Sequence, residues 1–152
     1  MGWQAAVVGA LGVAQYKQQG AIGKYNKGVN DRNALIAEQE AVQIEKQSEF
    51  DIAQFNKQFT KLEGETQVAL SKSGVVSGTG TAYRIAMQNA LEAELQKNII
   101  QYNAKVGAAK KIEEANFARI QGNIARQQAK LAQLGTLAST GTSLLTMSRG
   151  TA

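Results

Sequence analysis

Residues 71–80 read SKSGVVSGTG, and this glycine-rich break separates two long stretches of helix-forming sequence. Gln, Ala, Lys and Glu dominate both stretches, and all four favour an α-helix. The chain contains no proline, so no residue forces either stretch to end early. The break therefore predicts an all-α fold, a long antiparallel helical hairpin whose turn uses Gly74, Gly78 and Gly80 at positive φ.

The same break can also be interpreted as a phosphate-binding loop, because it is rich in glycine and precedes a helix. A dinucleotide-binding loop needs a preceding strand and a later acidic residue, and a P-loop needs the sequence Gly-Lys-Ser/Thr. The sequence shows neither pattern at this position. An inter-helix turn is the interpretation that agrees with the residues present.

The first helical arm is expected at residues 31–70, with Asn30 or Asp31 as its N-terminal cap. Apolar and small residues recur along it at steps of three and four, and Ala41 and Ile52 are eleven residues apart. An eleven-residue repeat keeps a stripe of side chains on one face of a nearly straight helix. The predicted stripe comprises Ala37, Ala41, Ile44, Ser48, Ile52, Phe55, Phe59 and Leu62.

The second arm is expected at residues 81–134, with Gly135 as its C-terminal cap and a Gly/Ser/Thr-rich tail at 135–152. It shares the eleven-residue repeat, so the two arms can pair along their length. Its predicted stripe comprises Leu95, Ile99, Tyr102, Val106, Ala109, Glu113, Phe117, Ile120, Ile124, Gln128, Leu131 and Leu134.

Residues 1–30 form a small-residue, apolar segment, for which we expect a short N-terminal helix followed by a glycine-rich hinge at 20–30. The uncharged part of this segment is too short to span a bilayer alone. It suits either the membrane interface or burial against a neighbouring subunit. The residues expected to make this contact are Trp3, Val7, Val8, Leu11, Val13 and Tyr16.

The charge pattern distinguishes the two ends of the chain from its middle. The formal net charge is +5, yet residues 1–30 and 115–152 contain seven basic residues and no acidic one. A basic, acid-free region suits an anionic partner such as a phosphate backbone or lipid headgroups. Arg119, Arg126 and Lys130 could contact phosphates, or they could form a solubilising stripe opposite the apolar seam.

The composition does not favour an enzyme. The chain has no His and no Cys, which removes the commonest general base, the commonest metal ligand and every thiolate. Its carboxylate pairs, such as Glu113 and Glu114, are explained by solvated helix faces. We therefore expect no catalytic residue, no cofactor and no metal site.

Residues 73–81 (SGVVSGTGT), followed by AYRIAMQNALEAELQKNIIQYNAKVGAAK, resemble the small internal virion proteins of short-tailed bacteriophages, also called ejection or core proteins. The matching pieces lie at 73–75, 78–79, 93–95, 99–104 and 142–145, within a resemblance that covers residues 30–147. The resemblance implies a homo-oligomeric ring inside the capsid beside core and portal proteins. It also implies ejection at infection and a role in a DNA conduit across the host cell envelope, including the outer membrane.

Two other functions agree with the residues alone. One is a coiled-coil adaptor or scaffold with purely protein partners, and the other is a helical protein that compacts DNA. Whichever function applies, a hairpin with so much Ala in its seam buries little apolar area by itself, and neighbouring subunits should supply the rest of the core. We therefore expect the hairpin to assemble into a ring or bundle.

Overall fold

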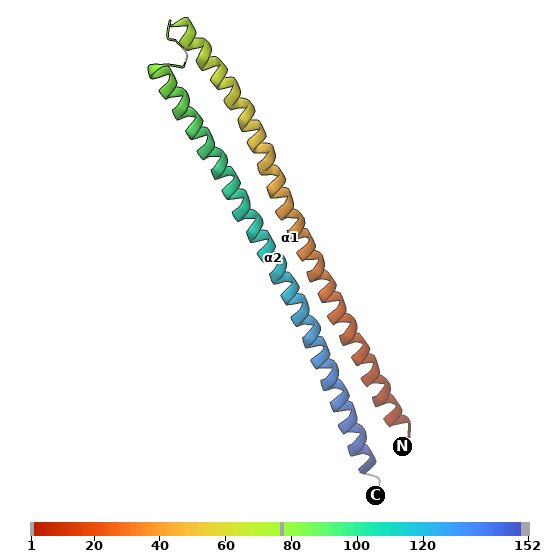
Figure 1. Ribbon diagram of the computed structural model, residues 1–152. Helices are drawn as coiled ribbons and strands as arrows, with labels where there is room; N and C mark the ends of the chain where they lie inside the picture. Colours follow the sequence, from red (N-terminus) through yellow and green to blue (C-terminus); the bar gives the residue numbers. More distant parts are fainter. Residues whose placement is uncertain (1, 77, 150–152) are drawn as a thin grey trace. The chain divides into compact units, whose positions relative to one another are not determined.

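The computed structural model consists of two long helices, α1 (Gly2–Lys72) and α2 (Gly80–Arg149), which pack against each other (Figure 1). It describes the backbone of residues 2–76 and 78–149, and of these the side chains of 6–76, 78–143, 145 and 146. No strand occurs within the described residues. The predictions of an all-α fold and of two long helices joined at a glycine-rich turn are therefore confirmed.

The turn depends on glycine at the predicted positions. Gly74, Gly78 and Gly80 adopt φ angles of 75°, 87° and 58°, in the left-handed region that other residues enter at a cost. The backbone N–H of Val75 donates to the carbonyl of Leu70, and that of Gly74 donates to Ser71. This pair of hydrogen bonds is the Schellman arrangement that ends a helix after a left-handed glycine.

Replacing Gly74 or Gly78 with alanine will therefore lower the free energy of unfolding, by about 1–2 kcal/mol for each left-handed residue. Gly64 provides the matched control, because it lies inside α1 with open space where a Cβ would stand. Gly64→Ala will raise stability by up to about 1 kcal/mol. Urea unfolding followed by circular dichroism measures both effects, and an equal response at Gly64 and Gly74 would contradict this account of the turn.

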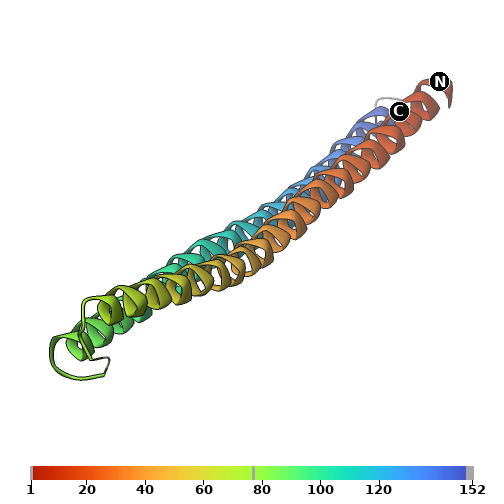
Figure 2. The ribbon, with the colours of Figure 1, turned by 90° about the horizontal axis from the view of Figure 1, so that it is seen from above.

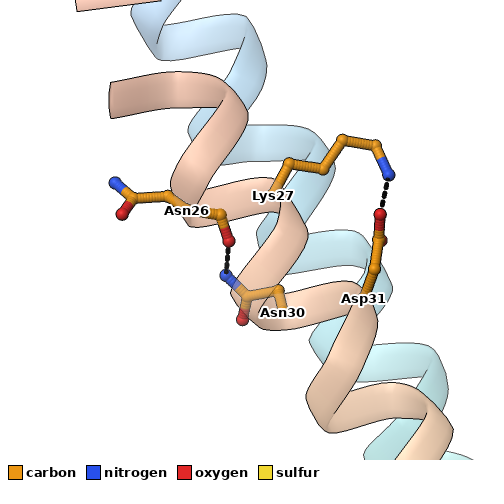
Figure 3. A network of polar contacts seen from close by, with 4 residues as sticks. All are labelled: Asn26, Lys27, Asn30 and Asp31. Carbon is orange, nitrogen blue, oxygen red and sulfur yellow. Dashed lines mark hydrogen bonds and ion pairs between the residues drawn. The ribbon is translucent and has the colours of Figure 1, made fainter. Parts of the chain in front are cut away.

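The short N-terminal helix and hinge predicted at 1–30 are corrected by the structure, because α1 runs through this segment without interruption. Asn30 and Asp31 do not cap a helix. The side-chain N–H of Asn30 donates to the carbonyl of Asn26 at 2.9 Å, and Asp31 pairs with Lys27 on the same helix (Figure 3). Glycine lowers helix stability by only about 1 kcal/mol relative to Ala, so helix packing can compensate for it where the segment contacts α2.

The predicted end of the second arm at Gly135 is also wrong, since α2 continues to Arg149. The Ser and Thr side chains of this segment are accommodated within the helix. The hydroxyl of Thr140 donates to the carbonyl of Thr136 at 2.7 Å, and the hydroxyl of Ser143 donates to the carbonyl of Ser139 at 2.8 Å. These bonds to the preceding turn satisfy the hydroxyls without breaking the helix.

The contacts divide the chain into two units. The terminal unit comprises Met1–Ala37 and Glu113–Ala152, and the turn unit comprises Glu38–Ile112. In the terminal unit, the N-terminal part of α1 lies beside the C-terminal part of α2 in both ribbon views (Figures 1 and 2). The units differ in charge, because the terminal unit has eight basic and three acidic residues whereas the turn unit has nine of each. The terminal unit thus carries the entire formal net charge of +5.

In the turn unit, the stripe predicted for the first arm faces α2. Ala41 is buried, and the remaining members from Ile44 to Phe59 are half-buried. Leu62 is more exposed, at 53% of its surface, although it lines a hollow together with Phe55, Phe59 and residues of α2. Ala37, which belongs to the terminal unit, is also buried. The prediction for the first arm is therefore confirmed over most of its length.

The stripe predicted for the second arm is wrong, because its large residues point away from α1. Leu95, Val106 and Phe117 are 58%, 38% and 60% exposed. The buried hydrophobic residues of α2 are all alanines among the described side chains, and four of them recur at the predicted interval of eleven: Ala82, Ala93, Ala104 and Ala115. The last three stand two positions before Leu95, Val106 and Phe117, and Ala108 is the fifth buried alanine. Residues two apart on an α-helix lie about 200° apart around its axis. The predicted eleven-residue repeat is therefore correct, but the predicted contact face of α2 is wrong.

Complementary size explains this choice of face in the turn unit. The contact face of α1 carries large residues, and the facing positions on α2 are small. A Cβ placed on Gly107 would stand 3.5 Å from a methyl carbon of Ile44, so this glycine provides the space that the Ile44 side chain occupies. Large side chains that face small ones pack at high density, whereas two large stripes would hold the helices apart.

Candidate functional site

The terminal unit has a seam of small residues on both helices. A Cβ on Gly12 would stand 2.5 Å from the hydroxyl of Thr140, and one on Gly23 would overlap the Cβ of Ala129. A Cβ on Gly122 would stand 3.5 Å from the carbonyl oxygen of Lys27, so the two backbones approach each other closely there. Ala34, Ala37 and Ala115 form the buried cluster of this unit.

Two hydrogen bonds fix the pairing of the helices in this unit. The side-chain amide of Gln133 donates to the backbone carbonyl of Tyr16 at 2.8 Å. The hydroxyl of Thr136 donates to the side-chain oxygen of Gln19 at 3.0 Å. These bonds join residues 117 apart in sequence, so they hold the basic end segments of the chain side by side.

A groove on one side of this seam is lined by four basic side chains. Lys17 and Lys24 come from α1, and Arg126 and Lys130 come from α2. The groove has a volume of about 410 Å³, and the smallest residues of the seam, among them Gly23 and Ala129, also line it. No acidic residue within the described part of the chain lines it, and all four basic side chains are exposed.

Among the described side chains, these four basic residues form no hydrogen bond or ion pair, in contrast to their neighbours. Lys27 is paired with Asp31 in the same unit (Figure 3). Lys111 pairs with Glu40 at 2.9 Å in the turn unit. The groove therefore holds four cationic groups without an acidic partner among the described residues.

The predicted phosphate-contact residues are only partly brought together. Arg126 and Lys130 line the groove, whereas Arg119 does not and engages another group. Lys17 and Lys24 were missed as site residues. A turn centred near residue 76 pairs residues whose numbers sum to about 152, as in the contacts Gly12–Thr140 and Gly23–Ala129. This rule places Lys24 opposite residue 128, between Arg126 and Lys130.

The predicted N-terminal contact residues are mostly exposed. Val7, Leu11, Val13 and Tyr16 expose 48%, 58%, 53% and 37% of their surface, and Val8 is half-buried. The side chain of Trp3 lies outside the described residues. Val7 and Leu11 begin an outward apolar stripe on α1, whose other members in the terminal unit are Ile22, Tyr25, Val29 and Ile36.

The large apolar residues of α2 in the terminal unit form a second outward stripe. It comprises Phe117, Ile120, Ile124 and Leu131, with exposed fractions between 47% and 68%. Every buried hydrophobic residue among the described side chains is an alanine. The larger side chains are therefore available on the outer faces of both helices.

The described residues contain no helix long and apolar enough to cross a membrane. They also contain no group of three or more His, Cys, Asp or Glu side chains placed to hold a metal ion. Comparisons with protein-family models, with curated proteins and with solved structures find no match to this chain.

Proposed function

We propose that this chain is a structural virion component that assembles through the outer faces of its two helices. It sits near the portal of a short-tailed bacteriophage, is ejected at infection, and contributes to the conduit that carries DNA across the host cell envelope. The sequence resemblance at residues 73–110 supports the virion assignment. The outward apolar stripes support assembly and are the observation that carries the proposal.

The physical argument for assembly is the missing apolar burial. Full burial of a Leu, Ile or Phe side chain contributes about 1.5–3 kcal/mol, and an alanine contributes much less. Among the described side chains, no large hydrophobic residue is fully buried. The hydrophobic residues that are buried are all alanines. In the proposed assembly, contacts with other copies supply the further burial that stabilises the helices.

A second copy of the chain is the partner that matches both stripes. On α1, Leu11 and Ile22 are eleven residues apart, and so are Tyr25 and Ile36. On α2, Ile120 and Leu131 have the same separation. Because the two stripes share one repeat, the outer face of α1 can pack along the outer face of α2 from the next copy. A contact between two different faces, repeated from copy to copy, forms a ring when the rotation between neighbouring copies closes and an open filament when it does not. The ring is the form that we propose.

Flotation with anionic lipid vesicles tests the role at the envelope. We expect the intact chain to float with the vesicles and a chain without residues 2–15 to remain in solution. The double substitution Val7→Ser and Leu11→Ser will reduce flotation in the full-length chain, because it removes exposed apolar residues that would enter the membrane interface. Binding at the interface does not require a membrane-spanning helix.

Val42→Ser with Val68→Ser is the matched control, since these two residues are 50% and 55% exposed in the turn unit. The control should float as the unmodified chain does. Flotation of the truncated chain would contradict the role of the N-terminal segment. If no form floats, the envelope role is wrong, and a structural element of the particle or an adaptor with protein partners remains.

A further inference from the structure

The basic groove of the terminal unit differs from an ordinary basic surface in that its charges line one concavity. Four exposed cationic side chains converge on one concavity from two helices, and the lining contains no acidic residue. On α1 the next acidic residue is Asp31, which pairs with Lys27. On α2 the preceding acidic residue is Glu114, twelve positions before Arg126. Gathered like charges repel one another, and a bound polyanion would relieve this repulsion.

We infer that this groove binds the phosphodiester backbone of DNA. Arg126 and Lys130 stand four residues apart on α2, or about 6 Å along the helix axis. Lys17 and Lys24 stand seven residues apart on α1, or about 10 Å. Phosphates along one strand of duplex DNA advance by about 3.4 Å each. The two cations of each pair are therefore spaced to contact phosphates that lie a few positions apart on one strand.

The lining favours a phosphate backbone over a lipid surface. A helix that binds the membrane interface carries large apolar residues beside its basic ones. Of the residues that the structure describes, the only apolar ones that line this groove are Gly and Ala. Ile22, which belongs to the outward stripe of α1, stands two residues from Lys24 and therefore about 200° around the helix from it.

The lining also predicts that binding is independent of base sequence. No aromatic side chain lines the groove, so none is placed there to stack on an unpaired base. Contacts to phosphates fix the position of a protein on DNA but carry no sequence information. The inference rests on the proposed function for the choice of DNA as the polyanion, while the charge arrangement of the groove stands by itself.

The test is binding of the full chain to fluorescent DNA duplexes of two unrelated sequences, measured by anisotropy over a series of salt concentrations. We expect equal affinity for both sequences and a steep decline with salt. Substituting all four groove residues (Lys17→Gln, Lys24→Gln, Arg126→Gln and Lys130→Gln) should reduce the slope of log K against log salt by about 3–4, because each phosphate contact contributes about 0.9.

The matched control removes four exposed lysines from the turn unit: Lys46→Gln, Lys57→Gln, Lys105→Gln and Lys110→Gln. Both variants lower the formal net charge of +5 by four, so they differ only in where charge is lost. Circular dichroism confirms that each remains helical. Equal loss of DNA binding in both variants, or an unchanged slope in the groove variant, would overturn the inference.

Flotation of the groove variant with anionic vesicles separates DNA from lipid as the ligand. We expect it to float as the unmodified chain does, because the apolar stripe is intact. Loss of flotation with full DNA binding would assign the groove to lipid headgroups and overturn the inference. The proposed function is tested by assembly and by flotation of the Val7 and Leu11 variant, so either proposal can fail without the other.

Discussion

Replacing Gly23 with alanine will destabilise the helix pair of the terminal unit, whereas replacing Gly28 with alanine will stabilise it. Both glycines lie inside α1, so each gains about 1 kcal/mol of helix propensity from alanine. Their surroundings differ. A Cβ at Gly28 meets open space, but a Cβ at Gly23 overlaps the Cβ of Ala129. That atom cannot rotate away, so the helices must separate locally.

The expected cost of this overlap is about 1–3 kcal/mol, which exceeds the gain in propensity. Thermal unfolding at a fixed protein concentration should therefore show a lower Tm for Gly23→Ala and a higher Tm for Gly28→Ala. Gly20→Ala should have a smaller effect than Gly23→Ala, because the atom that it would meet is the end of the Gln133 side chain, which can move at the cost of its hydrogen bond to the carbonyl of Tyr16.

A swap across the seam isolates the contact itself. Ala129→Gly frees the space that a Cβ at position 23 requires, at the cost of about 1 kcal/mol in helix propensity. The double variant Gly23→Ala with Ala129→Gly should be more stable than the sum of its single changes predicts. Additive effects in this cycle would show that the two residues do not face each other and would contradict the seam.

The second large effect concerns assembly. Replacing Phe117, Ile120 and Ile124 with serine will dissociate the assembled form without reducing the helicity of the chain at high concentration. The three side chains are 60%, 54% and 47% exposed, so they contribute little to the contact within one chain. If their exposed surface is buried between copies, its loss would cost about 5 kcal/mol, or roughly three to four orders of magnitude in the association constant.

Sedimentation velocity measures this change directly. The control is Val75→Ser with Val76→Ser, which removes exposed apolar surface from the turn, away from the outer faces of both helices. The control should sediment as the unmodified chain does. A serine variant of the α2 stripe that keeps the full assembled mass would show that this face is not the interface.

Local sequence signals predicted the turn and one contact face. Glycines at 74, 78 and 80 indicated a break that requires positive φ, and the structure has it there. The stripe of α1 from Ala41 to Phe59 was also predicted, because most apolar residues of this stretch follow one pattern, with Val42 and Phe50 as the large exceptions. The turn depends on the conformational preference of single glycines, and the contact face of α1 depends on one periodic pattern.

The contact face of α2 could not be chosen by hydrophobicity. Two stripes with the same repeat run along this helix, one of large residues and one of alanines. Hydrophobicity favoured the large residues, but the large side chains of α1 require small residues opposite them. The ends of the helices were misjudged for a related reason. Glycine and threonine lower the stability of an isolated helix. Where they allow two helices to approach closely, as at Gly12 and Thr140, the packing between the helices compensates for this loss.

The groove was partly predictable. The sequence showed that residues 1–30 and 115–152 are basic and free of acids, and it identified Arg126 and Lys130. Pairing about the centre of the turn would have added Lys24. Arg119 shares a face of α2 with Arg126 but lies seven residues, or about 10 Å, before it along the helix axis. Its absence from the groove therefore depends on how far the groove extends along α2 and on its other contact, which composition does not reveal.

The most direct test of the account is the mass of the unmodified chain in solution, measured by sedimentation equilibrium over a range of concentrations. We expect a multiple of the 16.2 kDa chain mass, with a Tm that rises with concentration. A fully helical 16.2 kDa monomer with a sharp melt at the same temperature at every concentration would contradict the central claim that the outer faces of α1 and α2 bind further copies.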